Sequence, residues 1–223
     1  MSDLAAIVLA AGAGHRFGAP KALARWRGRT WLALALANLS EAGFDSIVVV
    51  IGAQAARVRQ EAQTEVDSAW HEQMAGSGCA DLRWVTNAQW QAGRSGSLAR
   101  GISALDAGMR GALIHAVDHP LVQVSTFAGL ARAFSQSASP TRRIFVPRFA
   151  GQRGHPILIG SMIWPEIQAL GADEPLRQVV HRDPGRIHEV PVDDAGIHGN
   201  VNRREQWEAH VQGHGERSSE RQE

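Results

Sequence analysis

The junction between an apolar run and a glycine-rich stretch near the N-terminus leaves few folds open to this chain. Leu4–Ala10 is apolar throughout and passes directly into Gly12, Gly14 and Gly18, after which comes Lys21. A run without polar alternation is typical of a strand buried on both faces in a parallel sheet. Glycines let the backbone turn sharply and aim consecutive N–H groups at one anion. The sequence therefore predicts a buried strand followed by a phosphate-binding loop.

Further strands and helices alternate along the first half of the chain. Residues 46–51 and 111–117 are apolar runs like the first. Residues 29–42, an apolar stretch that Gly43 ends, and residues 53–63, which show helical spacing, are predicted helices. Strand, helix, strand, helix within about 60 residues is typical of right-handed βαβ units. We expect an α/β fold, with three layers, Rossmann-like, and a mostly parallel central sheet.

The rest of the chain adds shorter elements to this pattern. Residues 143–146 and 156–159 resemble two strands of a small hairpin-like insertion, and residues 64–81 show weak periodicity typical of a surface excursion. Residues 87–96 are predicted to form a loop. Strands are expected at residues 82–86 and 187–192, and helices at 97–105, 126–134, 162–170, 175–181 and 203–211. We expect one domain over residues 1–211 and a disordered tail over residues 212–223.

Composition excludes several classes of protein. The 23 basic residues nearly balance the 22 acidic ones, so bulk charge does not favour a nucleic-acid partner or a membrane surface. One cysteine, Cys79, excludes an internal disulfide framework and a thiolate metal cluster. No apolar run is long enough to span a bilayer, and the first residues lack a signal-peptide pattern. We expect a cytoplasmic protein.

The glycine-rich loop admits four interpretations. A dinucleotide fingerprint requires a tighter glycine spacing and an acid after the second strand, where Ile51 and Gly52 stand instead. A Walker loop requires Lys followed by Ser or Thr, whereas Lys21 follows Pro20 and precedes Ala22. A nucleotidyltransferase loop around a nucleoside triphosphate fits every position. The fourth interpretation, a plain turn, gives no reason for the two cations at Arg16 and Lys21, the only lysine in the chain.

Four sequence blocks carry a resemblance to one family. LAAGAGHRFGAPK at residues 9–21 resembles the pattern L-A-[AG]-G-x-[GS]-x-R-[FM]-G-x-x-K of the MobA-like nucleotidyltransferases. NAQWQAGRSGSL at 87–98, VDHPLV at 117–122 and GQRGHP at 151–156 follow in family order. Within the family, the chain is most similar to molybdenum cofactor cytidylyltransferases and related accessory proteins of molybdenum hydroxylases.

The resemblance implies a set of nucleotide-binding residues. Ala11, where other members have glycine, is typical of members that take cytosine nucleotides, so the implied substrate is CTP. The segment from Gly93 to Ser97 offers hydroxyl and N–H groups near a helix start, although a plain capping turn explains it as well. Gly96 replaces a family serine. The full implied set is Leu9, Ala10, Ala11, Gly12, Ala13, Gly14, Arg16, Lys21, Asn87, Gly93, Ser95, Ser97 and Asp118.

Asp118 follows the predicted strand at residues 111–117, at the sheet edge where ligands bind in open α/β sheets. A carboxylate there is a natural ligand for magnesium, and a turn acid or helix cap is the alternative. The resemblance implies that Asp118 and Asn202 hold Mg2+, with His119 in place of a family glutamine. A turn asparagine is the alternative for Asn202.

The resemblance also implies the reaction. Arg16, Lys21 and Asp118 would catalyse transfer of CMP from CTP to the phosphate of a molybdopterin cofactor, with Arg153 and His155 contacting that acceptor. Such an acceptor is already ionised, so neither a general base nor a covalent nucleophile is needed. Transfer to another phosphate acceptor and a non-catalytic carrier that serves a molybdenum hydroxylase remain as alternatives.

Overall fold

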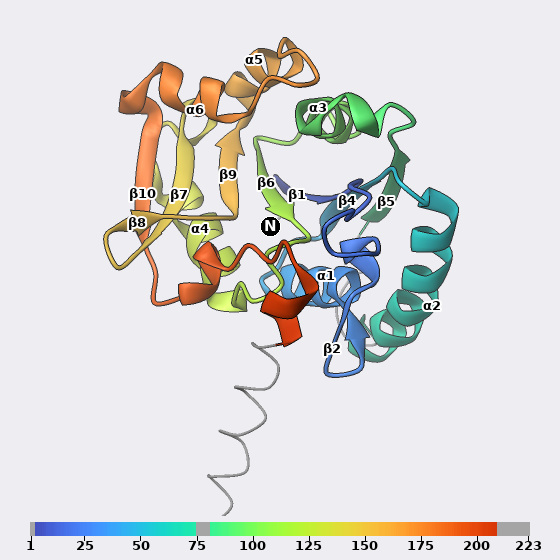
Figure 1. Ribbon diagram of the computed structural model, residues 1–223. Helices are drawn as coiled ribbons and strands as arrows, with labels where there is room; N and C mark the ends of the chain where they lie inside the picture. Colours follow the sequence, from blue (N-terminus) through green and yellow to red (C-terminus); the bar gives the residue numbers. More distant parts are fainter. Residues whose placement is uncertain (1–2, 75–80, 209–223) are drawn as a thin grey trace, which may run out of the picture.

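The computed structural model describes residues 3–74 and 81–208, with the side chains of residues 66–74 outside this description. Its centre is a sheet of eight strands in the order β10-β7-β9-β6-β1-β4-β5, with β8 paired to β7 (Figure 1). The strands are β1 (Leu4–Ala10), β4 (Ser46–Ile51), β5 (Asp81–Thr86), β6 (Gly111–Ala116), β7 (Ile144–Phe149), β8 (Gln152–Arg153), β9 (Ile157–Gly160) and β10 (Ile187–Pro191).

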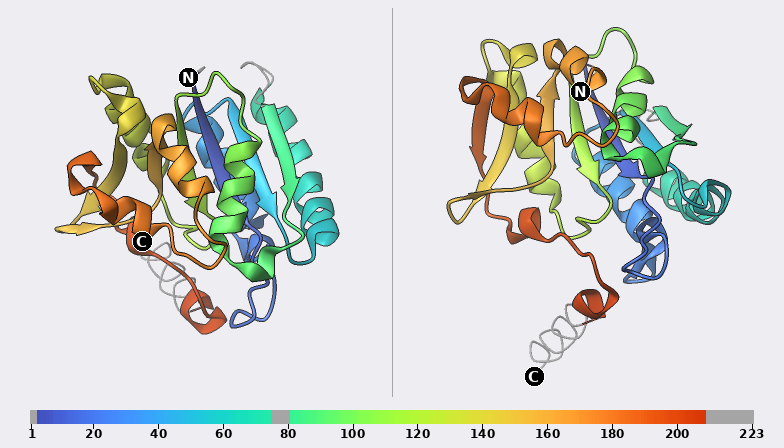
Figure 2. Two further views of the ribbon diagram at one scale, coloured as in Figure 1. Left: turned by 90° about the horizontal axis from the view of Figure 1, so that it is seen from above. Right: turned by 45° about the horizontal axis from the view of Figure 1, so that its top comes forward.

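The sheet is mostly parallel, as predicted. β1 pairs in parallel with both β4 and β6, β4 with β5, and β10 with β7. β9 runs antiparallel to both β6 and β7. The predicted hairpin strands therefore exist, but they lie inside the main sheet between β6 and β10 rather than in an insertion beside it. β5 and β10 form its two edges (Figure 2).

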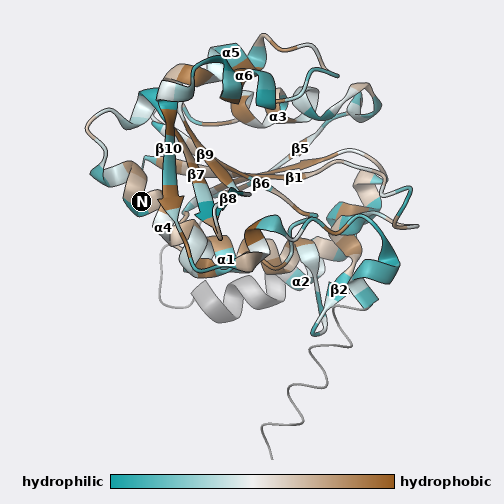
Figure 3. Ribbon diagram, turned by 60° about the vertical axis from the view of Figure 1, so that its left-hand side comes forward, coloured by the Kyte–Doolittle hydropathy of each residue, from teal (hydrophilic) through white to brown (hydrophobic). Residues whose placement is uncertain are grey.

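Helices cover both faces of this sheet and give the three layers (Figure 3). One layer holds α1 (Trp31–Glu41), α2 (Ala55–Met74) and α4 (Val124–Gln136); the other holds α3 (Arg94–Ser103), α5 (Trp164–Gln168) and α6 (Arg177–Arg182). Along β1, Ala6 and Val8 face the first layer and Ile7 faces the second. The apolar run at β1 is thus buried on both faces, for the reason that its sequence indicated.

Several predicted boundaries are wrong. Residues 64–74 continue α2 and do not form a surface excursion, while residues 75–80 lie outside the described residues. α3 begins at Arg94, three residues before the predicted start, inside the segment expected to be a loop. The predicted helix at 162–170 is a 3-10 turn followed by the short α5. The predicted terminal helix is helical over 204–208, and the expected tail lies outside the described residues.

A small antiparallel pair, β2 (Arg25–Trp26) and β3 (Arg29–Thr30), connects the glycine-rich loop to α1. The hydroxyl of Thr30 accepts the Ala33 N–H at 3.2 Å and caps α1. Within the described residues, no helix is long and apolar enough to cross a membrane.

Candidate active site

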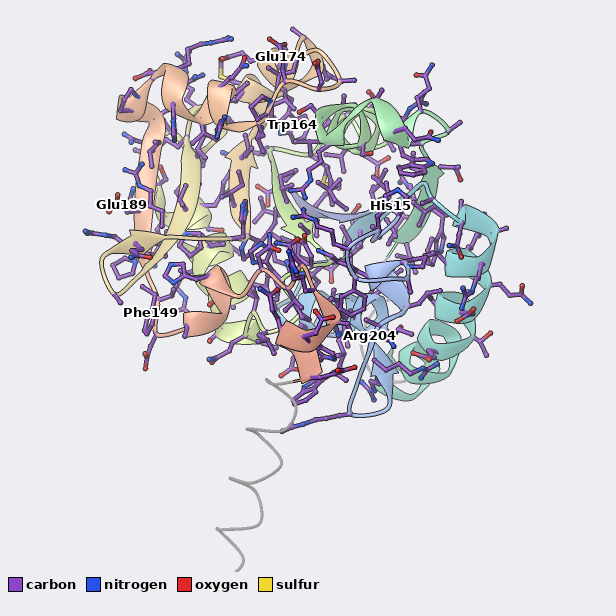
Figure 4. All side chains as sticks on the ribbon, viewed as in Figure 1. His15, Phe149, Trp164, Glu174, Glu189 and Arg204 are labelled. Atoms are coloured by element: carbon purple, nitrogen blue, oxygen red, sulfur yellow. The ribbon has the colours of Figure 1, made fainter. Side chains whose placement is uncertain are left out.

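A cavity of about 280 Å3 lies at the carboxyl ends of β1 and β6. It is bounded by the loop after β1, the segment that begins α3, the residues that follow β6, and the late segment at Asn202. His15 and Arg204, labelled in Figure 4, mark the first and last of these segments. Its lining residues are Leu9, Ala11, Gly12, Gly14, His15, Arg16, Lys21, Trp90, Gly93, Arg94, Ser97, Ala116, Val117, Asp118 and Asn202.

The Lys21 ammonium joins three distant parts of the chain inside this cavity. Its Nζ donates to Asp118 Oδ2 at 3.2 Å and to Asn202 Oδ1 at 2.9 Å, across 97 and 181 residues of sequence. The side chains of Lys21 and Asp118 are 14% and 11% exposed, so water screens their attraction only in part. The structure therefore brings Lys21, Asp118 and Asn202 together.

The loop after β1 turns back on itself to bring Lys21 there. The N–H groups of Phe17 and Gly18 both donate to the Gly14 carbonyl, at 2.8 and 2.9 Å. Gly14 has a φ of +65°, and a Cβ on it would lie 2.0 Å from the Ala19 carbonyl oxygen. A larger residue at position 14 would thus push apart the two arms of the loop.

The start of α3 is fixed by a loop from the other half of the molecule. Gly93 has a φ of +144°, and a Cβ there would lie 1.8 Å from the Ala172 carbonyl oxygen. The Ser95 hydroxyl donates to the Glu174 carbonyl. Residues on both sides of Arg94 are therefore held against the loop at 172–174.

Asn87 and Ser95, both predicted nucleotide-binding residues, lie beside the cavity rather than in its lining. Asn87 is 1% exposed, and its amide donates to Ser97 Oγ at 2.9 Å while its oxygen accepts the Gln89 N–H. Ser97 does line the cavity, so Asn87 positions a lining hydroxyl.

Ala10 and Ala13 also lie outside the lining. The other predicted residues of the loop and of α3, together with Asp118 and Asn202, are in it. Sequence reasoning missed His15, Trp90 and Arg94. Trp90 lies in the block NAQW and Arg94 in the block GRSGS, so both stand in segments that carry the family resemblance, although neither was assigned a role.

The two predicted acceptor residues are placed differently from each other. Arg153 Nε donates to Glu189 Oε1 at 2.7 Å, and Arg148 makes a second ion pair with the same carboxylate at 3.3 Å. Glu189 lies at the far side of the sheet from His15 in Figure 4. His155 instead approaches the cavity, because its ring centroid is 4.9 Å from that of His119, the residue after Asp118.

The buried histidines next to the cavity are uncharged at neutral pH. Burial, the largest cause, acts together with His155, Lys21 and Arg94 to lower the pKa of His119 to about 4, against the opposing effect of Asp118. Desolvation, together with the charge of Arg94, also lowers the pKa of His155. Burial lowers the pKa of His115 to about 3. These imidazoles are therefore poor general acids at pH 7.

The donor atoms around Asp118 fit a divalent cation that shares its shell with a ligand. Asp118 Oδ1 is buried and has no hydrogen-bond partner, and Asn202 supplies an amide oxygen beside the other carboxylate oxygen. Among the side chains of residues 3–65 and 81–208, no group of three or more His, Cys, Asp or Glu residues is arranged to hold a metal ion. The oxygens of Asp118 and Asn202 suit magnesium, which commonly takes its remaining ligands from phosphates and water.

A family profile described as the MobA-like NTP transferase domain matches residues 6–188. The chain belongs to the MobA-like family of nucleotidyltransferases. The resemblance that the glycine-rich loop indicated is thereby confirmed, together with the three-layer fold.

Individual relatives cover nearly the whole chain. Nicotine blue oxidoreductase of Paenarthrobacter nicotinovorans is 28% identical over 205 residues, which are 90% of this chain and 92% of that protein. Rv0371c from Mycobacterium tuberculosis H37Rv matches with a TM-score of 0.70 at 24% identity, over 94% of this chain and 97% of that one.

A nucleotidyl transferase from Methanothermobacter thermautotroptrophicus, Mth528, matches with a TM-score of 0.72 at 21% identity, over 96% of this chain and 98% of that one. The two solved structures support the fold, and the family assignment comes from the sequence profile.

Proposed function

We propose that this protein transfers CMP from CTP to the phosphate of a molybdopterin-type cofactor and releases pyrophosphate, with Mg2+ bound at Asp118 and Asn202. The observation that carries the proposal is the position of Lys21 Nζ, which bonds both Asp118 and Asn202 within the cavity. A cation beside a carboxylate with a free oxygen is the arrangement that a triphosphate and its metal ion require.

Triphosphate binding changes the partners of Lys21. Without a ligand, its ammonium compensates the charge of Asp118. The β- and γ-phosphates offer Lys21 a larger negative charge, and Arg16 and the loop N–H groups add further donors. Lys21 then neutralises the leaving pyrophosphate, and both Asp118 oxygens become free for the metal ion.

The bound metal ion would neutralise phosphate charge during transfer. Asp118 supplies a carboxylate for it and Asn202 a neutral oxygen, so the protein contributes one negative charge. The remaining charge balance comes from Arg16 and Lys21. Such electrostatic stabilisation is the main task of a phosphoryl-transfer site.

Ala11 and Trp90 form the part of the cavity suited to the nucleobase. Gly52, at the end of β4, lies under Trp90, since a Cβ on it would be 2.6 Å from Trp90 Cβ and 2.7 Å from the Ala11 carbonyl oxygen. Trp90 therefore lies against Gly52 close to Ala11, and its indole offers a flat apolar wall for a base. The Ala11 methyl group narrows this end of the cavity, which favours the smaller cytosine ring of CTP.

A second candidate comes from the name of one relative. An oxidoreductase that is 28% identical over 90% of the chain indicates that this fold is compatible with a redox reaction. A nicotinamide dinucleotide also carries a pyrophosphate, which the cations of the loop are able to bind. The absence of an acid after β4, where Gly52 stands, weighs against this candidate.

The test is release of pyrophosphate from the full chain with Mg2+, a molybdopterin cofactor and each of CTP, GTP, ATP and UTP. We expect release with CTP and not without Mg2+. If pyrophosphate were released only when a sugar or alcohol phosphate took the place of the molybdopterin cofactor, the acceptor would belong to that class instead. Tight binding of CTP without turnover would indicate a carrier. Oxidation of NADH or NADPH without nucleotide transfer would favour the reductase. If the proposed reaction holds, a molybdenum hydroxylase in the cytoplasm is the expected recipient.

A further inference from the structure

We propose that Arg94 binds the anionic group of the acceptor, and that it rather than Arg153 sets the preference of this site for a phosphate-bearing acceptor. This inference rests on the proposed transfer reaction and adds a residue to it. Arg94 lines the same cavity as Lys21 and Asp118.

The Arg94 guanidinium is exposed and available for a ligand. In the part of the chain that the structure describes, no hydrogen bond or ion pair involves its side chain, whereas Arg153 is bound to Glu189. An arginine presents several N–H donors in a planar fork that matches the oxygens of a phosphate. The free arginine at the cavity is thus better suited to an anion than the paired one.

The position of Arg94 in its helix is unfavourable without a ligand. It is the first residue of α3, and the first turn of that helix has no acidic residue. The N-terminus of a helix carries a partial positive charge, so a cation there is repelled. A bound anion would reverse this repulsion, since both the guanidinium and the free N–H groups of the first turn attract it.

The backbone of Arg94 is held in place by its neighbours. Gly93 packs against the Ala172 carbonyl, and Ser95 donates to the Glu174 carbonyl. Little backbone freedom is then lost when the side chain binds a ligand, which favours binding.

Arg94 and Lys21 approach the cavity from opposite faces of the sheet. Lys21 begins a short turn that packs on the layer of α1 and α2, while α3 belongs to the other layer (Figure 3). Arg94 thus enters the cavity from the side of α3 and Lys21 from the side of the loop after β1.

The chemistry of the reaction places the acceptor on the side of α3. An acceptor phosphate oxygen forms a bond to the α-phosphorus while the bond from that phosphorus to the α–β bridging oxygen breaks, and the electron pair leaves with pyrophosphate. The two oxygens lie in line on opposite sides of the phosphorus. Because Lys21 and Arg16 are assigned to the leaving pyrophosphate, the incoming phosphate approaches Arg94.

The experiment compares Arg94→Gln with Arg100→Gln, a matched control. Arg100 lies in the last turn of α3, is exposed and is outside the cavity lining. Calorimetric titrations with inorganic phosphate and with phenyl phosphate are made on the full chain, both free and saturated with Mg2+ and an α,β-methylene analogue of CTP. We expect Arg94→Gln to weaken phosphate binding at least about 10-fold and to change the affinity for the CTP analogue less than about 2-fold. Arg94→Lys should restore part of the lost phosphate affinity.

Kinetics give a second readout that a merely structural role would not change. Arg94→Gln should raise KM for the molybdopterin acceptor at least about 10-fold, with KM for CTP unchanged. Equal phosphate affinity in Arg94→Gln and Arg100→Gln would overturn the inference, as would a loss confined to the CTP analogue. If the wild-type chain bound no CTP, the proposed function would fail, yet the nucleotide-free titration would still decide whether Arg94 binds phosphate.

Discussion

Two carboxylates in this molecule, Glu166 and Asp118, differ in how many of their oxygens accept a hydrogen bond. Glu166, on the layer of α5 and α6, accepts from Arg182 at 2.9 Å and from two nitrogens of Arg186, so both of its oxygens have partners. Asp118 accepts from Lys21 on one oxygen, and its other oxygen is buried without a hydrogen-bond partner, 4.0 Å from the Nε2 atom of His119.

The difference separates a structural ion pair from a binding site. The arginine partners of Glu166 hold the pKa of that carboxyl below its usual value, with the hydrogen bond from Arg186 as the largest cause. A buried oxygen without a partner costs free energy unless a ligand completes it. The comparison indicates a structural role for Glu166 and agrees with the proposed binding role of Asp118. Each of the following variants tests one of these two roles.

Asp118→Asn should have the largest effect. It removes the one protein charge of the metal site while nearly preserving the shape of the side chain, so turnover should fall by at least about 10³-fold. Release of pyrophosphate measures the loss, and thermal unfolding should show that the variant still folds, with a midpoint somewhat below that of the wild type because Lys21 loses its counter-charge. Retention of magnesium-dependent turnover would point to another ligand.

Lys21→Gln should follow, with a loss of at least about 10²-fold. It removes the charge that neutralises the leaving pyrophosphate, while an amide at this position still hydrogen-bonds Asp118 or Asn202 and preserves the fold. A steady-state assay against Arg100→Gln as control measures the effect. Unchanged turnover in the Lys21 variant would contradict the assignment of the loop.

Glu166→Gln should show the opposite pattern. Loss of two charge-assisted interactions should lower the free energy of unfolding by about 1–2 kcal/mol, since the side chain is partly exposed and water screens part of the attraction. Turnover at saturating substrate should stay within about 2-fold of the wild type. Urea denaturation measures the stability and the same pyrophosphate assay measures the turnover. A large loss of turnover at unchanged stability would contradict the structural role of Glu166.

His115 gives a smaller effect that depends on pH. Its folded-state pKa of about 3 lies below the ordinary value of 6.5, so the unfolded chain binds the extra proton between these values. The free energy of unfolding is therefore highest, as far as His115 is concerned, above pH 6.5. It decreases as pH falls toward 3, by at most about 1.4 kcal/mol per pH unit.

Replacement of this histidine by leucine isolates its contribution. His115→Leu should flatten the fall in stability between pH 6.5 and 5, with little loss at pH 8 because the buried Nδ1 has no partner to lose. His181→Leu, at an exposed position, should leave the pH profile unchanged. Identical profiles for the wild type and the His115 variant would show that His115 is not the group responsible.

The sequence was most informative where local pattern and burial agree. β1 and the loop after it were predictable because an apolar run next to spaced glycines and cations has few structural solutions, and Asp118 because it ends another such run. α2 was underestimated because its second half is polar and lacks a clear apolar stripe.

Contacts between distant segments were not predictable from local pattern. Glu189 pairs with Arg153 across 36 residues of sequence, and the Glu174 carbonyl accepts a hydrogen bond from Ser95 across 79. Neither Glu189 nor Glu174 lies in a recognisable motif. These contacts are the reason that two residues expected to touch substrates are instead bound to the protein. Lys21 and Asn202 are 181 residues apart, and they were placed together through the resemblance rather than through spacing.

The most direct test of the central claim is a crystal structure of the full chain with CTP and Mn2+, in which anomalous scattering locates the metal ion. We expect an anomalous peak that contacts Asp118 and Asn202, with Lys21 Nζ moved from the carboxylate onto the β- or γ-phosphate. A nucleotide bound in this cavity while Lys21 still bonds Asp118, or a metal ion located away from Asp118, would contradict the account.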